Sequence, residues 1–268
     1  MNNHPIGVFD SGIGGLTVAN AIQKHLPNEN LIYFGDTAHL PYGDKSAMSI
    51  QAYSLKIADF LLSQNCKAIV IACNTASSHA YDVVRAAITI EIPVINVIDP
   101  VVKYVSSNDK CQHIGVIATK GTIQSNVYAR KLLQAKVTLN VASLATPLLV
   151  PMIEEGFHDN NISHAVIAQY LSTQELKGID TLILGCTHYP LIEAEINEYY
   201  KGSVQIVDSA NIVAQHTFLE LKEKNLLNEL PATNSHHFYV SDFTKSFEQS
   251  ARFFFKGDIK LEYYNLWS

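Results

Sequence analysis

The chain has 268 residues, of which 47% are hydrophobic and 16% are charged, and its formal net charge at pH 7 is −6. This composition is typical of a globular protein with a sizeable core. The acidic balance and the lack of a basic run give no reason to expect a nucleic-acid partner.

The beginning of the chain and its apolar runs bear on location. Residues 1–5 lack the charged and apolar regions of a signal peptide. No apolar stretch approaches the roughly 20 residues that a membrane-spanning helix needs. We therefore expect a cytoplasmic protein with no membrane partner.

Four cysteines are present, and without an export signal they are expected to be free thiols. They do not form a C-x-x-C pair, so a zinc ribbon or a thioredoxin-type site is not expected, and no metal is predicted. The cysteines are Cys66, Cys73, Cys111 and Cys186.

Short runs rich in Val and Ile alternate along the chain with amphipathic stretches. Residues 46–64 carry apolar side chains at spacings of three and four, which predicts a helix, and 122–133 and 191–200 show a similar pattern. Strand and helix in alternation are typical of an α/β fold with a parallel sheet. The predicted strands are 6–9, 31–34, 68–72, 94–97, 113–118, 137–141, 181–185 and 204–207.

The two halves of this pattern resemble each other. The tripeptide Ile-Gly-Val opens strands at 6–8 and at 114–116, and each half then runs to a strand that ends in a cysteine, Cys73 or Cys186. The alternative is chance recurrence of common strand dipeptides. Internal repetition instead predicts two pseudo-symmetric α/β domains with mostly parallel sheets, which face each other across a cleft.

The last 60 residues complicate a division into two halves. A helix begins at Asp208-Ser209 and runs to about residue 224, since Asp and Ser are favoured helix caps. A polar turn at 231–235, a strand at 237–240, a helix at 243–255 and a strand at 260–265 are predicted to follow. We expect this tail to return to the first domain, which gives domains of 1–97 plus 209–268 and of 98–208.

Polar residues follow four of the predicted strands. In open α/β sheets the working residues lie beyond the carboxyl ends of the strands, so these clusters are expected to meet at one site. They are Asp10-Ser11-Gly12, Gly35-Asp36-Thr37 with Pro41-Tyr42-Gly43, Cys73-Asn74-Thr75, and Cys186-Thr187-His188.

The glycine-rich turn at 10–17 allows three interpretations. A dinucleotide site is disfavoured, because Thr17 replaces the third glycine of the fingerprint and Asp10 would place a negative charge beside a pyrophosphate. The turn could instead offer N–H groups to a carboxylate ligand, or it could be a tight turn with Asp10 as a cap.

Cys73 and Cys186 each follow a strand at the entry of a predicted helix. The positive end of a helix lowers the pKa of a thiol and favours the thiolate. A single buried cysteine is usually structural. Two at matched positions, each flanked by hydrogen-bonding residues, favour a catalytic pair. Cys66 and Cys111 lack such flanks and are expected to be structural.

Taken together, these segments resemble the glutamate racemases of the cofactor-independent aspartate/glutamate racemase family. The resemblance implies two α/β domains with the active site between them. It also implies interconversion of L- and D-glutamate for cell-wall peptidoglycan without a cofactor. The matching stretches are 7–16, 35–37, 41–43, 72–76, 184–191 and 207–210.

The resemblance also implies residue roles. Inversion by proton transfer needs a base on one face of the substrate and an acid on the other. Cys73 is expected to take the proton from D-glutamate with assistance from Asp10, and Cys186 to take it from L-glutamate with assistance from His188. Glu154 is either a further acidic residue near the site or an exposed helix-end glutamate. The expected substrate-binding residues are Asp10, Ser11, Tyr42, Gly43, Asn74, Thr75, Thr187 and His188.

Other functions remain open from the sequence. Relatives with paired cysteines act on other small substrates, so a racemase of aspartate or of a hydantoin is the main alternative. A two-lobed protein that closes on an amino acid without inverting it, and a Rossmann-type oxidoreductase, are disfavoured by the features above. The expected partner is glutamate itself, and because relatives are commonly dimers a homodimer is expected.

Overall fold

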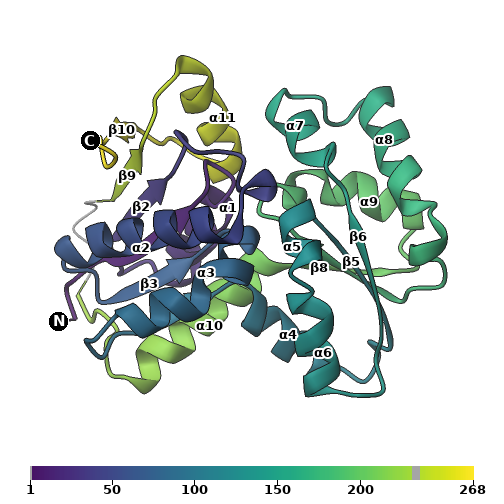
Figure 1. The fold of residues 1–268 in the computed structure, drawn as a ribbon, viewed down its shortest axis with the longest axis horizontal. Coiled ribbons are helices and arrows are strands. Elements are labelled where there is room, and N and C mark those ends of the chain that lie inside the picture. Colours follow the sequence, from purple (N-terminus) through teal and green to yellow (C-terminus); the bar gives the residue numbers. More distant parts are fainter. Residues whose placement is uncertain (1, 231–235) are drawn as a thin grey trace.

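The computed structural model describes residues 2–230 and 236–268 and contains two parallel sheets that lie side by side, each with helices on its faces (Figure 1). In the first sheet the strand order is β10-β9-β2-β1-β3-β4, and in the second it is β6-β5-β7-β8. The first sheet comprises β1 (Ile6–Asp10), β2 (Leu31–Gly35), β3 (Ala68–Ile71), β4 (Val94–Asn96), β9 (His237–Val240) and β10 (Leu261–Tyr263). The second comprises β5 (His113–Ala118), β6 (Asn140–Ala145), β7 (Thr181–Gly185) and β8 (Gln205–Asp208).

Helices connect successive strands, as right-handed crossovers between parallel strands require. Three short 3₁₀ segments are η1 (Tyr42–Asp44), η2 (Gln174–Leu176) and η3 (Tyr189–Ile192). The α-helices are α1 (Leu16–His25), α2 (Ala47–Ser63), α3 (Asn74–Ala87), α4 (Ile98–Ser107), α5 (Lys120–Gln124), α6 (Val127–Ala135), α7 (Leu149–Glu154), α8 (Asn161–Leu171), α9 (Glu193–Tyr200), α10 (Ser209–Glu223) and α11 (Lys245–Phe255). None of the helices in the described part of the chain is long and apolar enough to cross a membrane.

The strand orders confirm the predicted pseudo-symmetry. The run β2-β1-β3-β4 in the first sheet corresponds strand for strand to β6-β5-β7-β8 in the second, and every pair is parallel. Cys73 follows β3 and Cys186 follows β7, which are equivalent strands. The repeat therefore places both thiols at the carboxyl ends of equivalent strands.

The tail adds two strands to the first sheet. β9 pairs in parallel with β2, and β10 pairs with β9, while α10 packs against α1 and α4. We propose to keep the domain boundaries at 97/98 and 208/209 on this basis. The polar turn predicted at 231–235 lies outside the described residues.

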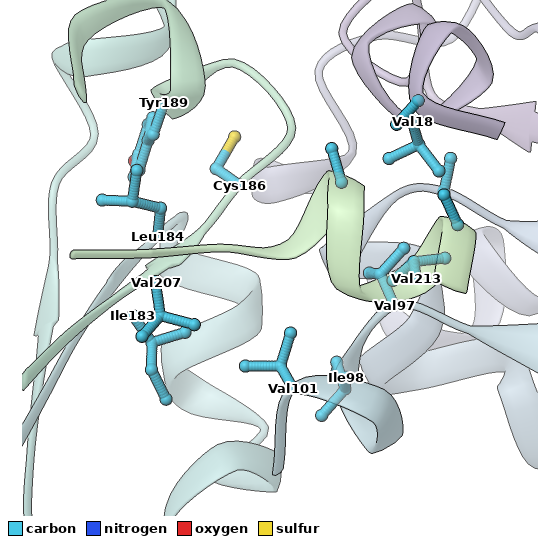
Figure 2. Packing of buried hydrophobic residues seen from close by; sticks show 14 of the residues in the cluster. Val18, Val97, Ile98, Val101, Ile183, Leu184, Cys186, Tyr189, Val207 and Val213 are labelled. Carbon is cyan, nitrogen blue, oxygen red and sulfur yellow. The ribbon is translucent and has the colours of Figure 1, made fainter. Parts of the chain in front are cut away.

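One hydrophobic cluster continues from the first domain into the second. It takes in the inner faces of α1, α4 and α10 and the strands β5 and β7, so the domain interface is itself core. Figure 2 shows part of this cluster around α10 and the loop that carries Cys186. The labelled side chains are Val18, Val97, Ile98, Val101, Ile183, Leu184, Cys186, Tyr189, Val207 and Val213.

Three predicted elements are corrected. The strand predicted at 137–141 lies at 140–145, because its pairing with β5 begins at Asn140; Val137 is left exposed. The helix predicted at 122–133 is two helices, α5 and α6, because Asn126 adopts a left-handed conformation between them (φ 53°). The helix predicted at 191–200 begins as the 3₁₀ segment η3, which contains Pro190, and becomes α-helical only at residue 193.

Candidate active site

The turn after β1 reaches across to the loop after β7. Asp10 is fully buried, and its carboxylate accepts the N–H of Gly12 (2.9 Å) and the hydroxyl of Thr187 (3.5 Å). Thr17 donates its hydroxyl to the carbonyls of Gly14 and Thr187. The two bonds that involve Thr187 join the two domains.

Gly14 is required by this close approach. A Cβ atom on Gly14 would lie 2.4 Å from Cε1 of His188 and 2.5 Å from Oγ1 of Thr187. Residues of the second domain therefore occupy the space beside the glycine turn, which leaves no room there for the pyrophosphate of a dinucleotide. This geometry weighs against the Rossmann-type alternative.

Cys73 caps α3, as the sequence predicts, but its electrostatics differ from the prediction. Its Sγ accepts the N–H of Ala76 (3.4 Å), and its thiol donates toward Oγ of Ser11 (3.7 Å). Burial, followed by the charge of Asp10, raises the pKa of the Cys73 thiol to about 12, against the lowering effect of the Ala76 N–H. The expected lowering of this pKa is thus wrong, because desolvation outweighs the helix terminus.

Cys186 has a different set of partners. Its Sγ lies 3.7 Å from Nδ1 of His188, whose Nε2 lies 2.8 Å from Oε1 of Glu154. Phe254 of α11 covers the imidazole edge-on. Burial alone would lower the pKa of His188, but the hydrogen bonds to Cys186 and Glu154 raise it to about 10. His188 is therefore an imidazolium at neutral pH, with both N–H groups engaged.

Tyr42 is held in place by the buried carboxylate of Asp36. Its hydroxyl donates to Asp36 (2.7 Å), and Asp36 also accepts from Ser241 (2.8 Å) and from the indole N–H of Trp267 (2.8 Å). His39 lies 3.0 Å from the same carboxylate. The hydroxyl of Tyr42 is therefore engaged by Asp36.

These groups surround one small cavity between the domains. All of the predicted catalytic and substrate-binding residues, and Glu154, line it except Asp10, whose carboxylate is held by two lining residues, Gly12 and Thr187. The cluster Gly35-Asp36-Thr37, which was also expected at the site, does not line the cavity. The assignment of Asp10 to substrate binding stays a prediction. The predicted lining residues are Ser11, Tyr42, Gly43, Cys73, Asn74, Thr75, Glu154, Cys186, Thr187 and His188.

The sequence argument missed three residues of the lining: Leu40, Thr119 and Val150. Gly12 and Pro41 belong to clusters that were expected at the site, but no role was assigned to them. Thr119 had a usable signal. It stands five residues after the Ile of the second Ile-Gly-Val, as Ser11 does after the first. Its hydroxyl lies 2.9 Å from that of Thr75, so it links the second domain to the first turn of α3.

The fold and the cavity define a class of protein. Two parallel α/β domains enclose a site with two buried thiols, several hydroxyls and an amide, which suits proton transfer on a small polar substrate. Within residues 2–230 and 236–268, three or more His, Cys, Asp or Glu side chains do not cluster in a way that could hold a metal ion.

Comparison with known proteins identifies the family. The model of the Asp/Glu/hydantoin racemase family matches residues 16–217. The chain belongs to this family and is an amino-acid racemase.

Individual relatives agree over nearly the whole chain. Glutamate racemase from Geobacter metallireducens is 42% identical, with 95% of this chain and 93% of the relative covered. Glutamate racemase from Neisseria meningitidis is 44% identical, with 91% of this chain and 89% of the relative covered. The crystal structure of the Francisella tularensis glutamate racemase with D-glutamate has a TM-score of 0.93 and 41% identity, and it covers 99% of both chains.

Proposed function

We propose that the protein is a glutamate racemase that inverts L- and D-glutamate by a two-base mechanism with Cys73 and Cys186 and without a cofactor. One observation carries the proposal: the two thiols line the same cavity from equivalent strand ends of two pseudo-symmetric domains. The relatives named above are glutamate racemases, and the Francisella structure holds D-glutamate.

Inversion explains why two thiols are needed. A single base would return the α-proton to the face from which it came, whereas a thiolate on one face and a thiol on the other exchange a proton across the carbanion. Cys186 takes the proton of L-glutamate while Cys73 protonates the opposite face, and in the reverse direction the two exchange roles.

The surroundings of the two thiols differ. The high pKa of Cys73, about 12, keeps it a neutral thiol near pH 7. Cys186 instead lies 3.7 Å from Nδ1 of His188, whose pKa is raised to about 10. The charge of Asp10 acts on Cys73, and we assign Asp10 to assist that thiol when it takes the proton of D-glutamate.

The carbanion needs stabilisation, because the α-proton of an amino acid is very weakly acidic. Hydrogen-bond donors aimed at the substrate carboxylates in a site with little water supply it. The cavity offers the hydroxyls of Ser11, Thr75, Thr119 and Thr187 and the amide of Asn74. From the resemblance, we further propose that the D-glutamate serves peptidoglycan synthesis and that the enzyme is a homodimer, which light scattering would test.

The activity is tested directly in deuterated water. The protein, incubated with L-glutamate and no added cofactor, is expected to abolish the optical rotation and to introduce deuterium at the α-carbon. Parallel reactions with L-aspartate and with a substituted hydantoin test the alternative substrates. Absence of inversion and of exchange with glutamate would contradict the proposal.

Variants of the thiols test the mechanism. Cys73→Ser and Cys186→Ser are each expected to lower kcat/KM by about 10²–10⁴-fold, because general acid–base catalysis contributes that much. Cys111→Ser is the matched control, since Cys111 is buried outside the cavity, beside Gln205. Near-normal turnover in either cavity variant, with the melting temperature preserved, would refute the two-thiol mechanism.

A further inference from the structure

The Asn74 side chain is satisfied at only one of its two ends. Asn74 follows Cys73, lines the cavity and is 3% exposed. Its Oδ1 accepts a hydrogen bond of 2.7 Å from the hydroxyl of Tyr128, whereas its Nδ2 has no hydrogen-bond partner among the described residues. A buried, unpaired amide N–H is costly and indicates that a ligand completes it.

Tyr128 comes from the other domain. It lies on α6 and is 2% exposed, and its ring lies beside the end of β7, where a Cβ on Gly185 would be 3.4 Å from Cε2 of Tyr128. One side chain therefore has its ring beside the residue before Cys186 and donates its hydroxyl to the residue after Cys73.

The hydroxyl determines which way the amide faces. Burial raises the pKa of Tyr128, so its hydroxyl keeps its proton and must donate it. In the observed orientation Oδ1 of Asn74 accepts that proton. In the flipped orientation the NH₂ group would meet the hydroxyl. The hydroxyl proton would then lack an acceptor among the described residues, and a carbonyl oxygen would face the anionic substrate.

We propose that Tyr128 is a positioning residue that fixes the Asn74 amide across the domain interface, so that the Nδ2–H of Asn74 donates to a carboxylate oxygen of the substrate. The proposal rests on the proposed racemase function. It adds a role for the second domain, which determines that the Asn74 side chain of the first domain presents its N–H group, and not its carbonyl oxygen, to the substrate.

The first test removes only the hydroxyl. Tyr128→Phe is expected to raise KM for both enantiomers on the order of tenfold, because a misoriented donor loses a hydrogen bond to a charged group. The change in kcat is expected to be smaller, since that bond already exists in the bound substrate. Tyr200→Phe is the control: its hydroxyl is buried and has no hydrogen-bond partner in the described chain, so KM should not change.

A double-mutant cycle separates positioning from a general structural effect. In an Asn74→Ala background, Tyr128→Phe should change KM by less than about twofold, because the group that it orients is gone. An equal rise in KM in both backgrounds would overturn the proposal, and so would an unchanged KM in the single variant.

Asn74→Asp gives an answer even if the Tyr128 variant fails to fold. It keeps an acceptor for Tyr128 but replaces the N–H donor by a carboxylate oxygen, so KM should rise further than in Asn74→Ala. Substrate binding as tight as in the unmodified enzyme would show that no donor at this position faces the substrate. Failure of the racemase function itself would be seen separately, as inactivity of the unmodified protein.

Discussion

The two thiols occupy equivalent places in the fold but have unlike neighbours. Cys73 is next to a hydroxyl, a backbone N–H and the charge of Asp10, whereas Cys186 is next to an imidazolium that Glu154 holds. Burial and the charge of Asp10 keep the Cys73 thiol neutral, whereas Cys186 has a charged hydrogen-bond partner. The asymmetry of the site is therefore a property of single residues and not of the architecture.

Glu154 is predicted to control the charge of His188. Glu154→Gln removes a hydrogen-bonded carboxylate that raises the pKa of the imidazole. The alkaline limb of the pH profile of kcat/KM should therefore move to lower pH, with an activity loss on the order of tenfold at pH 8. An alkaline limb at the same pH as in the unmodified enzyme would contradict this role.

The raised pKa of His188 makes the stability of the folded protein depend on pH. Its pKa of about 10 in the folded protein exceeds the 6.5 of the free side chain, so the folded state keeps a proton that the unfolded state releases. The stabilisation is complete below pH 6.5 and is lost as the pH rises through about 10, by at most about 1.4 kcal/mol per pH unit.

Urea unfolding from pH 6 to pH 9 tests this dependence. The free energy of unfolding should fall across this range in the unmodified protein and fall less in His188→Gln. Cys73, whose pKa also rises, contributes only above its unperturbed value of 9.0 and does not disturb the comparison. Equal slopes for the two proteins would show that His188 does not carry the proton.

The C-terminal segment is predicted to support the loop that carries Tyr42. Trp267 donates to Asp36, which in turn accepts the hydroxyl of Tyr42. Trp267→Phe should cost about 1–3 kcal/mol of unfolding free energy, because a buried carboxylate loses a donor, and it should raise KM. Tyr263→Phe, on the exposed end of β10, is the control. Unchanged stability and KM in Trp267→Phe would show that the tail is independent of the site.

Elements with a clear local signal could be predicted from the sequence. The apolar spacing of α2 and the apolar runs of β1, β3 and β7 locate those elements to within a residue or two. Other bounds depend on distant partners. β6 begins where its pairing with β5 begins, and the break between α5 and α6 depends on the left-handed backbone of Asn126. Neither feature can be predicted from the local spacing of apolar residues.

The candidate site was predictable where its residues adjoin a strand-end cysteine or the turn after β1. Leu40 and Val150 line the cavity because of the way the loops and the two domains pack, and no local sequence pattern marks them. The pKa of Cys73 was unpredictable for a related reason. The helix terminus can be read from the sequence, but the depth of burial that outweighs it comes from the tertiary structure.

At the scale of the whole molecule, the two domains are expected to unfold together. A single buried cluster includes residues of both, and the Asp10–Thr187 and Tyr128–Asn74 contacts cross between them. Scanning calorimetry should show one transition, with a calorimetric enthalpy equal to the van't Hoff enthalpy. Two resolved transitions would mean that the domains are energetically independent.

The central claim is that each thiol serves one face of the substrate, and isotope effects in the thiol variants test it most directly. The two directions of a racemase have an equilibrium constant of one, so kcat/KM must be equal in both and cannot separate the faces. A deuterium label at the α-carbon can separate them, because it reports which proton transfer limits the rate. Cys73→Ser should show a large primary isotope effect with labelled D-glutamate and a small one with labelled L-glutamate, and Cys186→Ser should show the reverse. The same pattern in both variants would contradict the assignment of one thiol to each face.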